Sequence, residues 1–239
     1  MKKKCSILIA GLLMMGLTIG VSNTLASVDV ESVWGEKDRK DTKDKHHHYE
    51  SEAILKIHAK ELGIAIEGKE IDVLKEEVHE AMLTNAAEEL GIKHEGKDIE
   101  ELKKEVFEAK ITKKAEELGI EASGKDTKAL AREVHQMKLM KKAEDLGIAT
   151  EGKEMKELKK EVMETKLTKE AKELGVDATD KDLKELAKEI HAMKVMQTAE
   201  KLGIKTTSRD AESLLNEIVT NYYEEAKGME LYPFTDMMH

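Results

Sequence analysis

Residues 125–148 read KDTKALAREVHQMKLMKKAEDLGI, and variants of this stretch fill most of the chain. Every variant ends in a Leu-Gly pair that is followed by Ile or Val. The glycines of these pairs recur at a constant interval of 28 residues, without insertions: Gly63, Gly91, Gly119, Gly147, Gly175 and Gly203. A constant interval of this length is typical of a tandem repeat protein. The sequence therefore predicts an array of six 28-residue repeats.

Each repeat is predicted to contain one helix of about 20 residues and a connecting loop of about eight residues. The Leu-Gly pair marks the helix end, because glycine adopts the left-handed conformation that follows many helices. An acidic residue then takes the N-cap position of the next helix: Glu70, Asp98, Asp126, Glu154, Asp182 and Asp210. A loop in every period excludes a continuous coiled coil, although 28 residues equal four heptads. The predicted fold is all-α: a solenoid-like or extended array of helix, Leu-Gly cap, short loop and helix.

The apolar residues of one helix fall into two sets. Leu102, Val106 and Ala109 form the first set, and Ile111, Ala115 and Leu118 form the second. Leu102 and Ile111 are nine residues apart, which places the two sets on opposite faces at 100° per residue. We therefore expect each helix to serve two neighbours, with its C-terminal half packed on the N-terminal half of the next helix. Each such pair is too small to be stable alone, so stacking makes the array viable.

Residues 87–102 carry a known pattern: Ala-Glu-Glu-Leu-Gly-Ile, a short extended stretch, Gly-Lys-Asp, and a second helix with Glu-Leu. This pattern resembles the helix, extended loop, helix modules of the SAP and HeH type, and the resemblance covers most of residues 55–220. It implies the fold of those modules, and since SAP-type modules often bind DNA, it also implies nucleic acid as a ligand. The chain is similar, too, to secreted tandem-repeat proteins of Gram-positive bacteria of unknown function.

Four regions are predicted. Residues 1–26 have a basic start, a short apolar run and a small-residue site at Thr24-Leu25-Ala26, as in a cleaved secretory signal peptide. Residues 27–50 are rich in charge and poor in apolar residues, which indicates a flexible leader. Residues 51–220 form the repeat array. Residues 221–239 contain most of the tyrosines, and we expect them to form a cap on the open end of the array or a tail that binds a partner.

The composition restricts the partners. Charged residues make up 38% of the chain and aromatic residues 3%, and the formal net charge is −10. An acidic chain is a poor match for nucleic acid or an anionic membrane, which need a basic surface. We therefore expect a non-enzymatic protein on the bacterial surface or in the medium, with another protein or a cell-wall or matrix component as partner. No membrane contact is expected after signal cleavage, and nucleic-acid binding stays open only through the resemblance.

No catalytic motif stands out, and no cofactor is predicted. The sequence lacks a Gly-x-Ser-x-Gly or His-Glu-x-x-His motif, and its only cysteine, Cys5, lies before the apolar run of the signal. Transition-metal binding is the alternative function, because thioether and imidazole groups suit copper. The candidate ligands lie near the two ends of the chain: His46, His47, His48 and His239.

Alternate repeats resemble each other more than neighbours do. His135, Met137 and Met140 recur 56 residues later as His191, Met193 and Met196, whereas the repeats between carry other residues at these positions. This pattern predicts a unit of two helices in which alternate helices face opposite sides of the array. Either the methionines fill a shared core, or the side with His and Met meets the partner.

Overall fold

The computed structural model describes residues 52–237, and within this range the chain is helical without strands. The helices are α2 (Glu52–Glu61), α3 (Ile71–Glu89), α4 (Ile99–Glu117), α5 (Thr127–Asp145), α6 (Met155–Leu174), α7 (Leu183–Lys201), α8 (Ala211–Asn221), α9 (Tyr223–Gly228) and α10 (Phe234–Met237). The predicted all-α repeat array is thus confirmed. The predicted signal peptide and leader lie outside the described residues. None of the described helices combines the length and apolar content needed to span a membrane.

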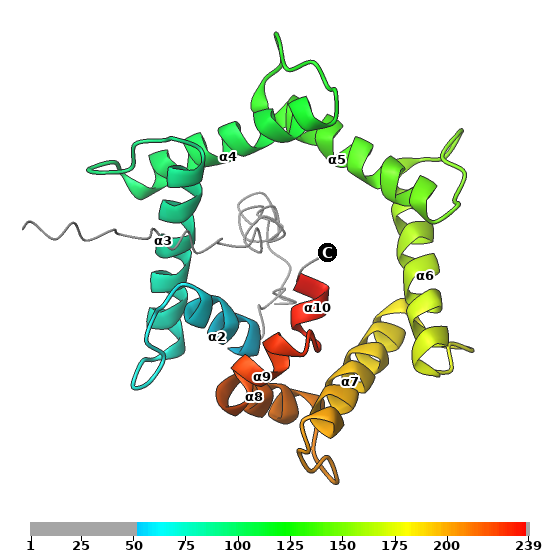
Figure 1. Cartoon of the computed structure of the whole chain (residues 1–239). Coiled ribbons are helices and arrows are strands. Elements are labelled where there is room, and N and C mark those ends of the chain that lie inside the picture. Colours follow the sequence, from blue (N-terminus) through cyan, green and yellow to red (C-terminus); the bar gives the residue numbers. More distant parts are fainter. Residues whose placement is uncertain (1–51, 238–239) are drawn as a thin grey trace, which may run out of the picture.

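Successive long helices meet at corners (Figure 1). Each corner has a small core from the C-terminal half of one helix, the loop, and the N-terminal half of the next. At the α4–α5 corner, Ile111 and Ala115 pack with Leu130 and Val134. The other half of α4 packs with α3 at the preceding corner, through Leu102 among others. The prediction that one helix serves two neighbours is therefore confirmed.

The Leu-Gly pair ends each helix as predicted. At the α5–α6 corner, the backbone N–H of Ile148 donates to the Ala143 carbonyl at 2.8 Å, and the N–H of Gly147 donates to the Glu144 carbonyl at 2.9 Å. This pair of bonds is a Schellman motif. Gly147 has a φ of 71°, in the left-handed region that disfavours residues with a Cβ atom. The fold of the corner therefore depends on glycine at this position.

Replacing Gly147 by alanine should lower the free energy of unfolding by about 1 kcal/mol, because alanine must adopt the left-handed conformation. An added Cβ would meet no atom within 4 Å at Gly147 or at Gly228, and Gly228, at the end of α9, does not have a positive φ. Gly228→Ala is therefore the matched control and should not destabilise the protein. Thermal unfolding of the two variants checks the prediction, and equal stability would contradict it.

The predicted acidic N-caps divide by side-chain length. Asp98 accepts hydrogen bonds from the backbone N–H groups of Glu100 and Glu101, and Asp126 accepts one from Ala129. Glu70 and Glu154 also occupy N-cap positions, but they make no side-chain capping bond. The extra methylene group of glutamate explains this, since capping favours the short side chains of Asp, Asn and Ser. The cap positions are confirmed, and the capping role is wrong for the two glutamates.

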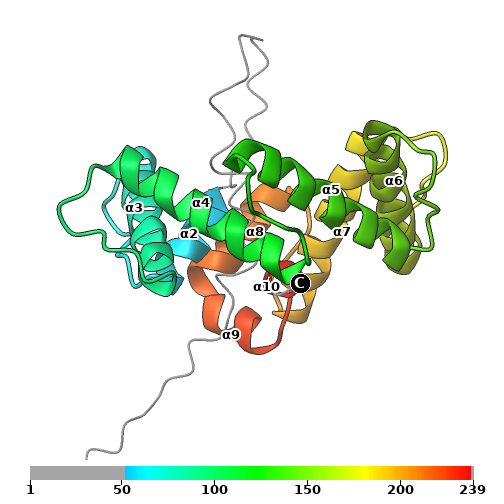
Figure 2. The same ribbon diagram turned by 90° about the horizontal axis from the view of Figure 1, so that it is seen from above.

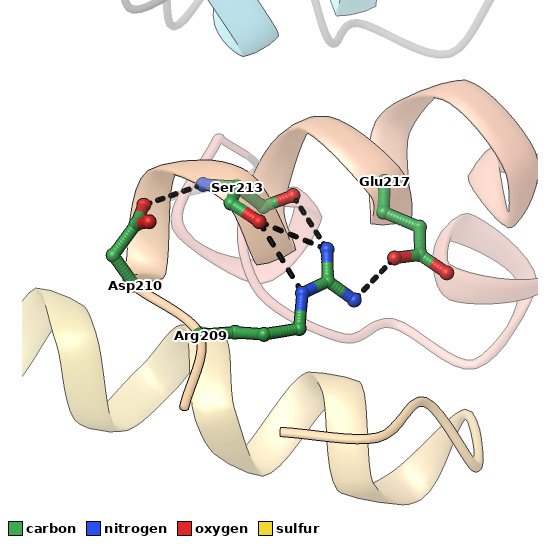
Figure 3. Close-up of polar contacts among 4 residues, drawn as sticks. All are labelled: Arg209, Asp210, Ser213 and Glu217. Carbon is green, nitrogen blue, oxygen red and sulfur yellow. Dashed lines mark hydrogen bonds and ion pairs between the residues drawn. The ribbon is translucent and has the colours of Figure 1, made fainter. Parts of the chain in front are cut away.

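An ion pair that sequence reasoning missed recurs at every corner. A basic residue at the end of each loop pairs with a glutamate eight positions later. Figure 3 shows the pair at the α7–α8 corner, where the Arg209 guanidinium contacts Glu217. The same guanidinium donates to the Ser213 hydroxyl at 2.9 Å, and Asp210 accepts the Ser213 backbone N–H at 2.8 Å. These contacts fasten the loop to the helix that it precedes.

The corners close into a ring (Figure 1). In the edge-on view of Figure 2, the helices α4 and α5 are inclined to the plane of the ring. The ring closes where α2 packs against α8. The loops point outward from the corners (Figure 1). Of the two shapes expected from the sequence, the structure has the solenoid-like one, bent until its ends meet.

The closure joins the first and last elements through a shared core. Ala53 and Ile57 of α2 lie in one cluster with residues of α7, α8, α9 and the tail, Phe234 among them. Polar contacts surround this core: Lys60 Nζ donates to the Thr220 carbonyl at 3.2 Å, and Lys227 Nζ lies 3.2 Å from Glu61 Oε1. The segment after α8 therefore lies between the two ends of the array.

Candidate functional site

The C-terminal tail, residues 229–236, identifies the side of the helices that faces the inside of the ring. The helix α10 lies inside the ring in Figure 1. From the tail, the Tyr232 hydroxyl lies 2.7 Å from His191 Nδ1, and Asp236 Oδ2 lies 2.7 Å from Lys194 Nζ. His191 and Lys194 belong to α7. The side of α7 that carries them therefore faces inward.

The 28-residue repeat extends this assignment to the other long helices. On α7, the corner-forming residues Ile190 and Ala199 pack with clusters at opposite ends of the helix. At 100° per residue, the inward direction lies about 90° from both packing directions. The helices α4, α5 and α6 pack through the equivalent positions. Their inward-facing residues are therefore found by subtracting 84, 56 and 28, respectively, from the numbers of the inward-facing residues of α7.

Basic residues concentrate on this inward half. At 100° per residue, every basic residue of α4, α5 and α7, and all those of α6 except Lys172, lies on this half or at its edge. The residues at the edge are Lys113, Lys141 and Lys169, which point in the same direction as the N-terminal packing residues of their helices. We call this set the lysine belt: Lys103, Lys104, Lys110, Lys113, Lys114, Lys128, Arg132, Lys138, Lys141, Lys142, Lys156, Lys159, Lys160, Lys166, Lys169, Lys184, Lys188, Lys194 and Lys201. Acidic residues on the same half are few: Glu100, Glu117, Asp145, Glu170 and Glu173.

The outward half of the same helices is acidic. It carries Glu101, Glu105, Glu108, Glu116, Glu133, Glu144, Glu157, Glu161, Glu164, Glu185, Glu189 and Glu200. The loop lysines pair with glutamates of this half, as in Lys125 with Glu133, which agrees with the outward position of the loops in Figure 1. The net negative charge therefore conceals a division of charge between the two sides of the ring.

Much of the belt is accessible to solvent. Lys138, Lys141 and Lys142 of α5 are exposed. Lys110 of α4 is half-buried, and burial lowers its pKa, although the negative charge of Glu89 opposes the shift. Helix neighbours three and four residues apart have Cβ atoms about 5–6 Å apart, so each helix presents a closely spaced row of ammonium groups. The belt can therefore hold several anionic groups in a line.

The tail covers one end of the belt. Lys194 lies between Asp236 and Glu170, whose Oε2 atom is 3.0 Å from Lys194 Nζ. Burial opposes the charge of Lys194, but the hydrogen bonds to Asp236 and Glu170 outweigh it and raise the pKa of this side chain. Burial also raises the pKa of Tyr232 to about 12. The phenol therefore stays protonated and offers no activated nucleophile beside His191.

Acidification should loosen the tail. Burial, and then the positive charge of Lys194, lower the pKa of His191 below its ordinary value of 6.5, although Asp236 opposes this. Because docking depresses the pKa of His191, the docked state is favoured above pH 6.5 and loses stability as the pH falls below it. Hydrogen exchange of residues 229–237 should accelerate, after correction for intrinsic rates, between about pH 7 and about pH 5.5.

The control is His191→Gln, which keeps a polar side chain beside Tyr232 but cannot be protonated. The tail of this variant should show little change in protection over the same range. Equal pH dependence in both proteins would assign the effect to other groups near the tail, such as Asp236 or Glu170, and contradict the role of His191.

The candidate metal ligands His46, His47, His48 and His239 lie outside the described residues. Within residues 52–237, no three His, Cys, Asp or Glu side chains are grouped so that they could hold a metal ion. Metal binding by the two ends of the chain stays a prediction. The copper, zinc and nickel content of a dialysed sample tests it.

The predicted two-helix unit is corrected by the ring. His135 and His191 occupy equivalent positions on the inward side, but so do Phe107 and Met163 of the intervening helices, so alternate helices do not face opposite sides. The two methionines of α5 differ in burial. Met140 packs against the α5–α6 core, whereas 41% of Met137 is exposed. A core-filling role is therefore right for Met140 and wrong for Met137.

Comparison of the chain with protein-family models, with curated proteins and with solved structures finds no match. The resemblance to SAP and HeH modules stays an interpretation of the sequence.

Proposed function

We propose that this protein is a secreted, non-enzymatic interaction module of the bacterial surface, cell wall or matrix, and that it holds a macromolecular partner against the inner face of its ring. The division of charge between the lysine belt and the acidic outer side carries this proposal. An acidic chain that gathers its lysines on one continuous face creates a local positive potential, which attracts an anionic partner despite the net charge.

The geometry favours binding over catalysis. Within the described residues, His191 contacts the Tyr232 hydroxyl on the inner side, and that phenol is held in its protonated form. A nucleophile needs a lowered pKa or an adjacent base that takes its proton. The belt instead repeats one kind of side chain over four helices, which suits recognition of a repeated charge.

Two measurements test the proposal. The intact mass of protein collected from the culture medium should begin at Ser27, as the predicted cleavage after Ala26 requires. The purified chain should then cosediment with the envelope of the producing cells. Lys166→Glu, on the belt side of α6, should weaken this attachment several-fold at low salt. Lys172→Glu changes the charge equally on the outer side of the same helix and should not.

If the chain stays in solution with every envelope fraction, the proposed function is wrong. If both lysine variants lose attachment equally, net charge rather than the inner face determines binding, and the site assignment is wrong.

A further inference from the structure

The composition of the belt limits what it can recognise. Apart from Arg132, every member is a lysine, and lysine presents a compact charge with three rotatable donors. The inward half of α4–α7 carries no Tyr or Trp and a single Phe, Phe107, which packs against the α4–α5 core. Surfaces that bind single-stranded nucleic acid supply aromatic side chains on which bases stack. The belt lacks such a row of aromatic side chains, so it recognises the charge of a ligand and not its bases.

The belt side also offers few apolar anchors: the exposed large apolar side chains on the inward half of α4–α7 are Ile99 and Met163. Protein partners are usually held by a few buried aromatic or apolar residues, with charges at the rim. Here the most exposed part of the belt on α5 contains Lys138, Lys141 and Lys142 in succession along one face. An acidic polypeptide would find charges to pair with but few places to bury its own side chains. A ligand with a charge on every unit and little apolar surface fits the face better.

The lysine belt is continuous along the ring. It follows the inner side of four successive helices, and the tail contacts it at the α7 end, where Asp236 and Glu170 neutralise Lys194. The helices α4, α5 and α6 each contribute five basic residues to the lysine belt. A flexible linear polymer can follow such a curved row, whereas a compact ligand would use only one part of it.

We propose that the lysine belt of α4–α6 binds a base-free linear phosphate polymer, with a polyphosphate or phosphodiester backbone, along the inner face of the ring. This proposal rests on the proposed function and names its partner class. Each phosphate would accept hydrogen bonds from one or two lysine ammonium groups. Binding would release condensed counterions from the polymer, so that affinity falls steeply as salt rises.

Inorganic polyphosphate is the probe. Its binding to the full chain should be measured by calorimetry over a series of salt concentrations. The triple variant Lys138→Glu, Lys141→Glu, Lys142→Glu should lose roughly 100-fold in affinity at about 0.1 M salt and show a shallower salt dependence. Lys172→Glu should change affinity by less than about two-fold, since residue 172 lies outside the lysine belt. Circular dichroism verifies folding, and the triple Lys→Gln variant of the same positions should show a smaller loss in the same direction.

Competing ligands decide the partner class. Polyglutamate of equal charge should bind at least about tenfold more weakly than polyphosphate, and single-stranded DNA should bind no more tightly. Equal binding of polyglutamate would identify an acidic polypeptide as the partner, and tighter binding of DNA would identify nucleic acid; either result overturns the proposal. So does undiminished binding by the folded triple variant.

The two proposals can fail separately. A chain that cosediments with the envelope but does not bind polyphosphate would overturn the phosphate assignment and leave the proposed function standing. A chain that binds polyphosphate but no envelope fraction would do the reverse. Displacement from the envelope by added polyphosphate supports both.

Discussion

Ile57→Ala should open the ring. Ile57 is fully buried, with 0% exposed, in the core that α2 shares with α7, α8, α9 and the tail. Truncation of a buried isoleucine to alanine costs about 2–5 kcal/mol. The helix α2 has ten residues, too few to be stable in isolation, so it depends on the cores on its two sides. We expect an increased radius of gyration in solution scattering and faster hydrogen exchange in α2.

The control for this prediction is Ile71→Ala. Ile71 begins α3 and is 43% exposed, so the same truncation there removes little buried surface and should leave the radius of gyration unchanged. Equal scattering curves for Ile57→Ala and the unaltered chain would show that the closure does not depend on this core.

Ala143→Leu should destabilise the α5–α6 corner by about 1–3 kcal/mol, because a larger side chain in a well-packed core forces its neighbours apart. Ala143 is 0% exposed, and its carbonyl accepts the capping bond from Ile148. An alanine occupies this place at every corner: Ala59, Ala87, Ala115, Ala143, Ala171 and Ala199. In an open array, a changed angle at one corner only moves the free end. A closed ring has no free end, so the strain should spread to the corners on either side of the α5–α6 corner.

Thermal unfolding measures the effect of Ala143→Leu. Ala149→Leu serves as the control, since Ala149 lies six residues later in the exposed part of the same loop. An unchanged melting temperature for Ala143→Leu would mean that the space between α5 and α6 at this position can hold a larger side chain, and would contradict the prediction.

Local features of this fold could be predicted from the sequence. The 28-residue interval, the Leu-Gly helix ends and the two opposed apolar sets depend on residues close together in the chain, and each is confirmed. Met137 shows where such reasoning failed. It continues the face of Leu130 and Val134, but the packing direction of α5 reverses in mid-helix, so a residue further along that face meets solvent rather than core.

Closure of the ring could not be predicted in the same way. It depends on the sum of all corner angles, and a small change at each corner would leave an open spiral. The lysine belt is an intermediate case. A helical wheel of α4 places Lys103, Lys110 and Lys114 on one side, so the division of charge could have been found. Only the contacts of the tail with His191 and Lys194 show that this side faces inward.

The contacts at the closure have a consequence for how the chain reaches its native state. Lys60 and Thr220 are 160 residues apart in sequence, and Lys227 and Glu61 are 166 apart, whereas each corner joins helices that follow one another directly. Contacts between nearby residues form quickly, and contacts between distant ones form slowly. The corners can therefore assemble early, each from helices that follow one another in the chain. The inner face acquires its final curvature only when residues 214–234 reach α2.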